Sequence, residues 1–219
     1  MQAVGGAALN GEKALASDQS LGQTTPSGGE AATPVPGASA RSRRPIAVLA
    51  LASAVVLGID LVTKQLAVSE LAGREPVRLF GGAVYLDVIR NSGAAFSLGT
   101  GYTFVFPVIA MAVAAWIVWT ARRLRSVPWA IALGLVLGGA VGNLVDRIFR
   151  APGPMVGHVV DMVSLFAPRG EVFAVFNAAD SALCVGVALA LLLELTGRRV
   201  DGTRTRDRDQ AAVSDSARG

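Results

Sequence analysis

Two aspartates in this sequence carry charges that no neighbouring residue explains. Asp161 lies inside the apolar run Val159–Val163, and Asp180 lies in an apolar segment with no basic residue within four positions. Two carboxylates brought together at low dielectric constant cannot both ionise cheaply, so one of them keeps its proton. Such a pair can activate a water molecule with its base and polarise a carbonyl group with its acid, as in aspartic proteases. The sequence leaves open a separate packing or proton-relay role for each aspartate.

Other charged residues occur near the ends of apolar segments. Asp60 and Lys64 are an i, i+4 pair of opposite charge, a spacing that favours a structural ion pair over a catalytic one. Asp146 and Arg147 follow a long apolar segment, and we expect them to brace a helix end and the adjoining loops. A charged side chain at the centre of a membrane helix costs about 2.5–3.5 kcal/mol, so these residues should face the interior of a helix bundle.

The sequence offers little for a metal centre. It contains one histidine, His158, and one cysteine, Cys184. His158 and Asp161 could supply two ligands by their spacing, but no second histidine or thiol cluster accompanies them. We therefore expect no metal and no cofactor, and we expect Cys184 to be a small residue of the core.

The elements that position these side chains are those of a membrane protein. Of the 219 residues, 52% are hydrophobic and 16% are charged, whereas average soluble domains carry roughly 25% charge. The net charge of +4 and the pI of about 10.0 would suggest a nucleic-acid partner in a soluble protein. Here the arginines border apolar runs, so we expect a membrane and no nucleic acid.

Four apolar segments are long enough to cross a bilayer, which takes about 20 mostly apolar residues. They cover residues 46–68, 99–121, 126–145 and 172–193. The sequence therefore predicts an all-α membrane protein with four transmembrane helices, contained in a domain of residues 41–197. Residues 1–40 are rich in Gly, Ala, Ser, Thr and Pro, and residues 198–219 are highly charged, so both are expected to be disordered tails.

The arginines also predict how the helices are oriented. Clusters at residues 41–44, 122–125 and 198–199 flank one side, which the positive-inside rule assigns to the cytoplasm together with both termini. The loops 69–98 and 147–172 then face outward. This topology brings the charged residues into one layer near the outer face of the membrane.

The first outer loop and the third apolar segment each carry a structural pattern. Residues 77–90 read as two strands about Gly81-Gly82, which predicts a small β-hairpin at the membrane surface. Gly134, Gly138 and Gly142 recur every fourth residue, a spacing that lets another helix approach closely. Asp146 extends this row by one turn and should also face inward.

Five short motifs occur in order along the chain. They are Asp60–Lys64 (DLVTK), Asn91–Ser97 (NSGAAFS), Gly138–Arg147 (GGAVGNLVDR), Val159–Asp161 (VVD) and Phe176–Ser181 (FNAADS). Together they resemble the bacterial lipoprotein signal peptidase family, also called signal peptidase II, over about residues 46–196. Any one motif would be weak, whereas five in order on a four-span chain are highly specific.

The resemblance implies a membrane aspartyl endopeptidase that removes the signal peptide from diacylglyceryl-modified prolipoproteins, cleaving before the lipidated cysteine. The family's catalytic aspartates match Asp161 and Asp180. Further family positions match Asn91, Asn143, Arg147 and Asn177, which line the site or hold substrate, and Asp60, Lys64 and Asp146, which support it. The implied partners are lipidated prolipoproteins and membrane lipid. The enzyme is expected to be a monomer in the bacterial cytoplasmic (inner) membrane, with its site near the outer face.

Two features depart from the family pattern. The loop at residues 149–157 is several residues longer than the family leads us to expect, which bears on how the site is covered and on the placement of Asp161. The N-terminal 40 residues have no counterpart in the pattern.

Three other functions each fit part of the sequence. A proton-coupled transporter also places carboxylates in the membrane, but it usually has more spans or an inverted repeat. A serine–lysine peptidase could use Lys64 with Ser97 or Ser181. A non-catalytic assembly scaffold would show no protease activity at all.

Overall fold

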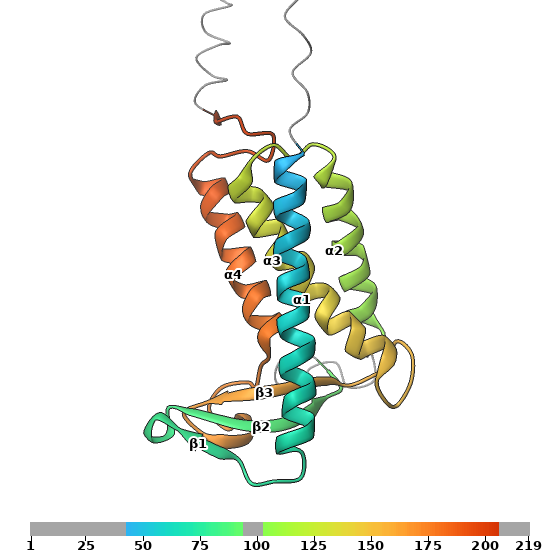
Figure 1. The fold of residues 1–219 in the computed structure, drawn as a ribbon, viewed down its shortest axis with the longest axis vertical. Helices are drawn as coiled ribbons and strands as arrows, with labels where there is room; N and C mark the ends of the chain where they lie inside the picture. The colour runs from blue at the N-terminus through green and yellow to red at the C-terminus, as the bar shows by residue number, and fades with distance from the viewer. Residues whose placement is uncertain (1–42, 94–102, 206–219) are drawn as a thin grey trace, which may run out of the picture. The chain divides into compact units, whose positions relative to one another are not determined.

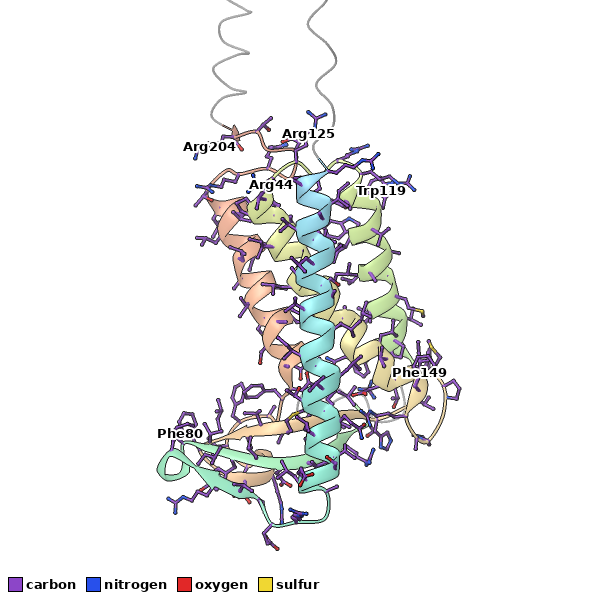
Figure 2. The ribbon with its side chains drawn as sticks, viewed as in Figure 1. Arg44, Phe80, Trp119, Arg125, Phe149 and Arg204 are labelled. Atoms are coloured by element: carbon purple, nitrogen blue, oxygen red, sulfur yellow. The ribbon has the colours of Figure 1, made fainter. Side chains whose placement is uncertain are left out.

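The computed structural model describes residues 43–93 and 103–205. Within these ranges a bundle of helices carries a small antiparallel sheet at one end (Figure 1). Arg44, Arg125 and Trp119 lie at the opposite end of the bundle, far from Phe80 and Phe149 at the sheet end (Figure 2).

Helix α1 (Arg44–Leu71) starts with a proline in its first turn, where the missing N–H costs no helical hydrogen bond. Its apolar side chains Leu51 and Val62 are more than half exposed, whereas Asp60 and Lys64 are completely buried. A helix in water buries the opposite set of residues. The arrangement suits a helix that faces lipid on its apolar side and keeps its charges inside the bundle.

Helix α3 (Val127–Phe149) packs against α1, α2 (Val105–Ala121) and α4 (Ala178–Leu195). The predicted glycine row explains the close approach of α1. A Cβ added to Gly134 would lie 2.8 Å from the carbonyl oxygen of Leu49, and one added to Gly138 would lie 2.7 Å from the Cβ of Val56. These glycines are therefore packing residues, as the sequence predicts.

The helices differ in their length relative to a bilayer. Among the described residues, α1, α3 and α4 are long and apolar enough to cross a membrane. Helix α2 is apolar but has 17 residues, which at 1.5 Å per residue is about 26 Å against a hydrocarbon core of about 30 Å. Residues 99–102 of the predicted second span lie outside the described residues. The structure thus has three membrane-length helices and one shorter apolar helix in the part of the chain that it describes.

The predicted hairpin is present and is part of a larger sheet. Strands β1 (Val77–Leu79) and β2 (Val84–Asn91) are antiparallel and are joined by the 3-10 turn η1 (Phe80–Gly82). A third strand, β3 (Val159–Leu165), pairs with β2, so the strand order is β1-β2-β3. The sequence analysis predicted a small sheet in the first outer loop but not β3, and the described fold is mostly helical with a three-stranded sheet. This third strand carries Asp161.

Helix α4 begins later than predicted. The fourth apolar segment was expected to be helical from Val172, but Phe176 pairs with Val163 through backbone hydrogen bonds of 2.9 Å in both directions. The segment before α4 is therefore extended, and Asn177 caps the helix. Cys184 of α4 is exposed, so the prediction of a core residue is wrong.

Residues 198–205, which the sequence analysis assigns to the charged tail, pack against the turn between α2 and α3. The carbonyl oxygen of Val200 accepts from the backbone N–H groups of Arg125 at 2.9 Å and Ser126 at 3.2 Å. Trp129 Nε1 donates to the carbonyl oxygen of Arg198 at 2.8 Å. Residues 206–219, the remainder of that tail, and residues 1–40 lie outside the described part.

Candidate functional site

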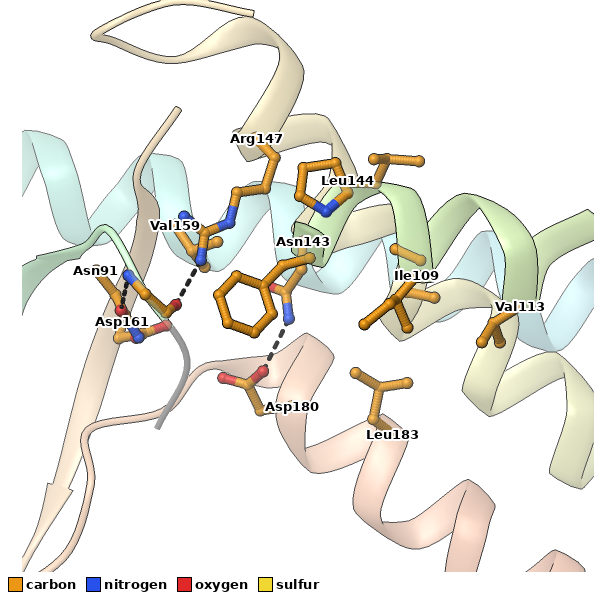
Figure 3. A pocket seen from close by; sticks show the side chains of 15 residues that line it. Asn91, Ile109, Val113, Asn143, Leu144, Arg147, Val159, Asp161, Asp180 and Leu183 are labelled. Carbon is orange, nitrogen blue, oxygen red and sulfur yellow. Dashed lines mark hydrogen bonds between the residues drawn. The ribbon is translucent and has the colours of Figure 1, made fainter. Parts of the chain in front are cut away.

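A cavity of about 330 Å³ lies where the helix bundle meets the sheet. Figure 3 shows Asp161 and Asp180 on its wall, one from β3 and the other from the first turn of α4. Polar residues lining it are Asn91, Asn143, Arg147, Asp161 and Asp180. The elements that supply them are β2, α3, β3 and α4, so residues 89 positions apart in the chain share one cavity.

Asp161 is almost completely buried, with 2% of its surface exposed. Its Oδ1 accepts from Asn177 Nδ2 at 2.7 Å, and its Oδ2 accepts from Asn91 Nδ2 at 2.9 Å. Burial raises the pKa of Asp161 to about 7, because desolvation penalises the charged form more than these hydrogen bonds favour it. The negative charge of Asp180 raises the pKa further. Asp161 therefore holds its proton up to neutral pH.

Asp180 is fixed by the cap of α4. Its Oδ2 accepts from the backbone N–H of Asn177 at 3.1 Å, while its own N–H donates to Asn177 Oδ1 at 2.9 Å. This reciprocal capping box satisfies donors that the helix leaves free. Asn143 Nδ2 donates to Asp180 Oδ1 at 2.8 Å. Both carboxylate oxygens of Asp180 are thus acceptors.

Asn177 connects the two aspartates. Its side-chain amide donates to Asp161, and its backbone N–H and side-chain oxygen bond to Asp180. A single buried residue therefore fixes both carboxyl groups relative to each other. The sequence analysis predicted this proximity from topology, and the structure shows the residue that enforces it.

A buried charge cluster supports the site from α1 and α3. Lys64 Nζ lies 2.7 Å from Asp60 Oδ2 and 3.1 Å from Asp146 Oδ2, and all three side chains are essentially unexposed. The predicted ion pair of Asp60 and Lys64 is thus confirmed, and Asp146 faces inward as expected. Arg150 donates to the other oxygen of Asp146, which balances the charges of the cluster.

Lys64 also orients an amide of the site. Its Nζ donates to Asn143 Oδ1 at 3.0 Å, so the Asn143 oxygen faces the cluster and its Nδ2 faces Asp180. The same ammonium group lies within ion-pair distance of Asp60 and Asp146, so three buried acceptor side chains surround it. Lys64 is therefore not available as the general base of a serine–lysine peptidase, and Ser181 Oγ donates instead to the Asn177 carbonyl oxygen at 3.0 Å. Ser97, the other serine considered, lies outside the described residues.

Arg147 holds the loops around the cavity. Its Nη1 donates to the carbonyl oxygens of Ser92 and Gly157, each at 3.0 Å, and its Nη2 donates to that of Gly93 at 2.5 Å. The guanidinium carbon is 5.6 Å from the centroid of the Phe106 ring. The predicted bracing of the loops is confirmed, and the predicted contact with substrate stays a prediction.

The sequence analysis missed several residues of the site. Gly157 anchors the long 149–157 loop, because a Cβ there would lie 2.7 Å from the carbonyl oxygen of Arg150. Its N–H donates to the carbonyl oxygen of Arg147 at 3.0 Å. The sequence signal that could have indicated this role is the presence of a glycine, Gly157, in the loop that follows Arg147. Nothing in the spacing indicated Phe106 or Arg150.

The far wall of the cavity is apolar. It is formed by α2 and α4 through Phe106, Ile109, Val113 and Leu183. Ile109, Val113 and Leu183 lie beyond the aspartates along the bundle (Figure 3). An apolar wall next to a pair of carboxyl groups can hold an apolar segment of a chain and present its polar backbone to an acid and a base. The geometry supports water-mediated cleavage of an acyl bond.

Comparisons with known proteins identify relatives of this chain. The family described as signal peptidase (SPase) II matches residues 52–196. A protein named lipoprotein signal peptidase from Mycolicibacterium smegmatis is 45% identical over 195 residues, covering 85% of this chain and 81% of the relative. Proteins of the same name from Streptomyces coelicolor and Rhodococcus jostii are 48% and 50% identical, covering 76% and 72% of this chain and 79% and 77% of those relatives.

Solved structures share the fold. Two structures described as a bacterial membrane enzyme, at 2.3 and 1.9 Å resolution, each align with a TM-score of 0.56 and 25% sequence identity. Each alignment covers 68% of this chain, with 88% and 94% of the respective solved chain. The bundle and sheet described above are therefore similar to those of a membrane enzyme.

Proposed function

The chain belongs to the signal peptidase II family and removes signal peptides from prolipoproteins, and we propose that Asp161 and Asp180 are its catalytic residues. The observation that carries this assignment is that Asn177 bonds to both aspartates beside one cavity. The unusual protonation of Asp161 adds to it, because an acid–base pair needs one neutral and one ionised member.

In the proposed reaction, a water molecule lies between the two carboxyl groups. Asp180 accepts a proton from this water as the water oxygen attacks the scissile carbonyl carbon. Asp161 donates its proton to the carbonyl oxygen, which becomes a hydroxyl of the tetrahedral intermediate. The intermediate then breaks its C–N bond, the leaving nitrogen takes the proton from Asp180, and Asp161 recovers its proton from the hydroxyl. Both carboxyl groups return to their starting states.

The substrate is proposed to lie along the cavity. The apolar wall formed by Ile109, Val113 and Leu183 suits the apolar signal segment. Asn91 and Arg147 would hold backbone carbonyl groups of the substrate, with Arg147 using the donors that the loops leave free. The diacylglyceryl chains on the substrate cysteine would stay in the bilayer, and cleavage would occur before that cysteine.

The membrane arrangement is proposed from the helices and the arginines. Helix α2 would be the fourth span of a peptidase domain at residues 41–197. The arginine-rich end of the bundle lies opposite the sheet (Figure 2). By the positive-inside rule, this arrangement supports a topology in which both termini are cytoplasmic and the site is near the outer face. The enzyme would act as a monomer in contact with lipid in the bacterial cytoplasmic membrane.

Two conservative substitutions test the catalytic assignment. Asp161→Asn and Asp180→Asn should each abolish cleavage of a synthetic lipidated precursor by the purified full-length protein, because neither amide can exchange the proton. Asp87→Asn is the matched control, since Asp87 lies on β2 but does not line the cavity, and it should cleave normally. Near wild-type turnover by either Asp161→Asn or Asp180→Asn would show that the assignment is wrong.

A further inference from the structure

The end of the bundle opposite the site carries a compact group of arginines. Arg122, Arg123 and Arg125 all lie in the short turn between α2 and α3, and all three are exposed. No salt bridge joins any of them to an acidic side chain within residues 43–93 and 103–205. Three positive charges in four residues without such a partner repel one another, so a bound anion would stabilise this turn.

These arginines surround a cavity of about 390 Å³. It is lined by Ile46, Arg122, Arg123, Leu124, Arg125, Asp201 and Thr203. Asp201 is the acidic residue of this lining, and its Oδ1 accepts from Thr203 at 2.7 Å and 3.0 Å. The lining is therefore a positively charged pocket with a hydrogen-bonded wall.

The wall at residues 198–205 is held in place. The backbone N–H of Arg125 donates to the carbonyl oxygen of Val200 at 2.9 Å, which links the arginine turn directly to this segment. Trp129 Nε1 fixes the carbonyl oxygen of Arg198 at 2.8 Å, and Val200 packs against the buried core of the bundle. The pocket is thus built by two segments far apart in the chain and is more than a run of exposed arginines.

An exposed apolar surface adjoins the positive pocket. Ile46 of the pocket lining is 45% exposed. Trp116 and Trp119 on α2 are about half exposed and line a neighbouring cavity, which shares Arg123 and Asp201 with the pocket and also contains Glu194. The Arg123 guanidinium carbon lies 5.5 Å from the centroid of the Trp119 ring, a cation–π contact that places the charge beside the aromatic surface. Tryptophan rings at this position are typical of the boundary between lipid chains and headgroups. A ligand here would meet charge and apolar surface together.

We propose that the Arg122, Arg123 and Arg125 pocket binds the phosphate of an anionic glycerophospholipid, with an acyl chain along Ile46. Guanidinium groups pair with phosphate oxygens through parallel hydrogen bonds, which suits a phosphodiester. A soluble phosphate would use the charge but leave the apolar surface unused. The site is separate from the catalytic cavity and does not depend on the assignment of Asp161 and Asp180.

The test measures lipid retention by the full-length protein. Purified protein is titrated with phosphatidylglycerol or phosphatidylcholine, and bound lipid is counted by native mass spectrometry. Wild type should retain phosphatidylglycerol preferentially. The triple variant Arg122→Ala/Arg123→Ala/Arg125→Ala should bind it roughly tenfold or more weakly, because each basic residue at a membrane surface contributes to anionic lipid binding. Cleavage of a lipidated precursor should be unchanged in this variant, which reports that it is folded.

A matched triple variant separates a built site from general surface charge. Arg43→Ala/Arg44→Ala/Arg204→Ala removes the same charge from exposed arginines at the same end of the bundle, outside the pocket lining. It should weaken phosphatidylglycerol binding by less than about twofold. Equal losses in the two triple variants, or no loss in either, would overturn the proposal. Displacement of the lipid by inorganic phosphate at similar concentration would identify a free-anion site and would also overturn it.

A measurement on the wild-type protein covers the case in which the pocket variant does not fold. A phosphatidylglycerol analogue with a photoreactive headgroup is crosslinked in nanodiscs, and the labelled peptides are sequenced. Labels should fall on residues 122–125 and 198–205. Labels spread evenly over Arg43 and Arg44 as well would contradict a specific pocket.

Discussion

Replacing Lys64 with methionine tests the buried charge cluster directly. Lys64 Nζ neutralises Asp60 at 2.7 Å and Asp146 at 3.1 Å, and no part of its side chain is exposed. Methionine has a similar length and fills the space without charge. The Lys64→Met variant leaves two buried carboxylates with one remaining cation, Arg150.

The cost follows from the partners that remain. Removing one member of a buried ion pair costs about 3–5 kcal/mol, because a charge stays buried without compensation. Asp60 Oδ1 still accepts from the Ala179 N–H at 3.0 Å, and Asp146 keeps Arg150, so we expect the lower end, about 3 kcal/mol. For a chain of this size, 1 kcal/mol shifts Tm by about 2–4 °C. The variant should therefore unfold roughly 6–12 °C below wild type.

The compensating double variant distinguishes charge from packing. Asp60→Asn/Lys64→Met makes the cluster neutral again, and the asparagine oxygen can still accept from Ala179. We expect it to recover at least half of the lost stability, about 1.5 kcal/mol or more. Thermal unfolding in detergent, followed by circular dichroism, gives both values.

A surface ion pair provides the control for this experiment. Arg169 is 62% exposed and lies 3.6 Å from Glu75, so Arg169→Met should change stability by less than about 1 kcal/mol. If Asp60→Asn/Lys64→Met is as unstable as Lys64→Met, or less stable, uncompensated buried charge is not the cause and the reasoning is refuted.

Three further predictions concern the site and its packing. Burial raises the pKa of Asp161 to about 7, so its neutral form is lost as pH rises through that value and kcat/KM on a lipidated precursor should fall about tenfold per pH unit above it. A flat pH profile of kcat/KM from about pH 6 to 9 would contradict this prediction. Asn177→Ala removes the side chain that holds both aspartates, and it should lower kcat by about 100-fold with little change in KM. A kcat near the wild-type value in steady-state kinetics would count against this role of Asn177. Gly142→Ala places a Cβ 2.6 Å from Asp60 Oδ2 and should lower the free energy of unfolding by about 1–3 kcal/mol, whereas the Cβ of Gly58→Ala meets no atom within 4 Å and should not change it. Equal losses of stability in thermal unfolding of the two variants would refute the packing argument.

Local spacing in the sequence determined much of the bundle. The i, i+4 spacing of Asp60 and Lys64 is enough to predict their ion pair, because residues four apart face the same side of any α-helix. The glycine row at 134, 138 and 142 predicts a close helix contact for the same reason. The turn at Gly81-Gly82 predicts the hairpin, because these residues adopt positive φ values of 69° and 102° without strain.

Only the tertiary structure decided the features that depend on residues far apart in the chain. Strand β3 forms because β2 offers it a partner edge, a pairing that the apolar run Val159–Val163 does not reveal by itself. The start of α4 is set by the bridge between Phe176 and Val163 and by the cap at Asn177, whereas hydropathy alone extends the segment to Val172. Hydropathy and helical spacing indicate which local conformations a segment favours. Hydrogen bonds between distant segments determine which of these conformations the folded chain adopts. For that reason the sequence could indicate Asp161 and Asp180, but only the folded chain shows Asn177 holding them together.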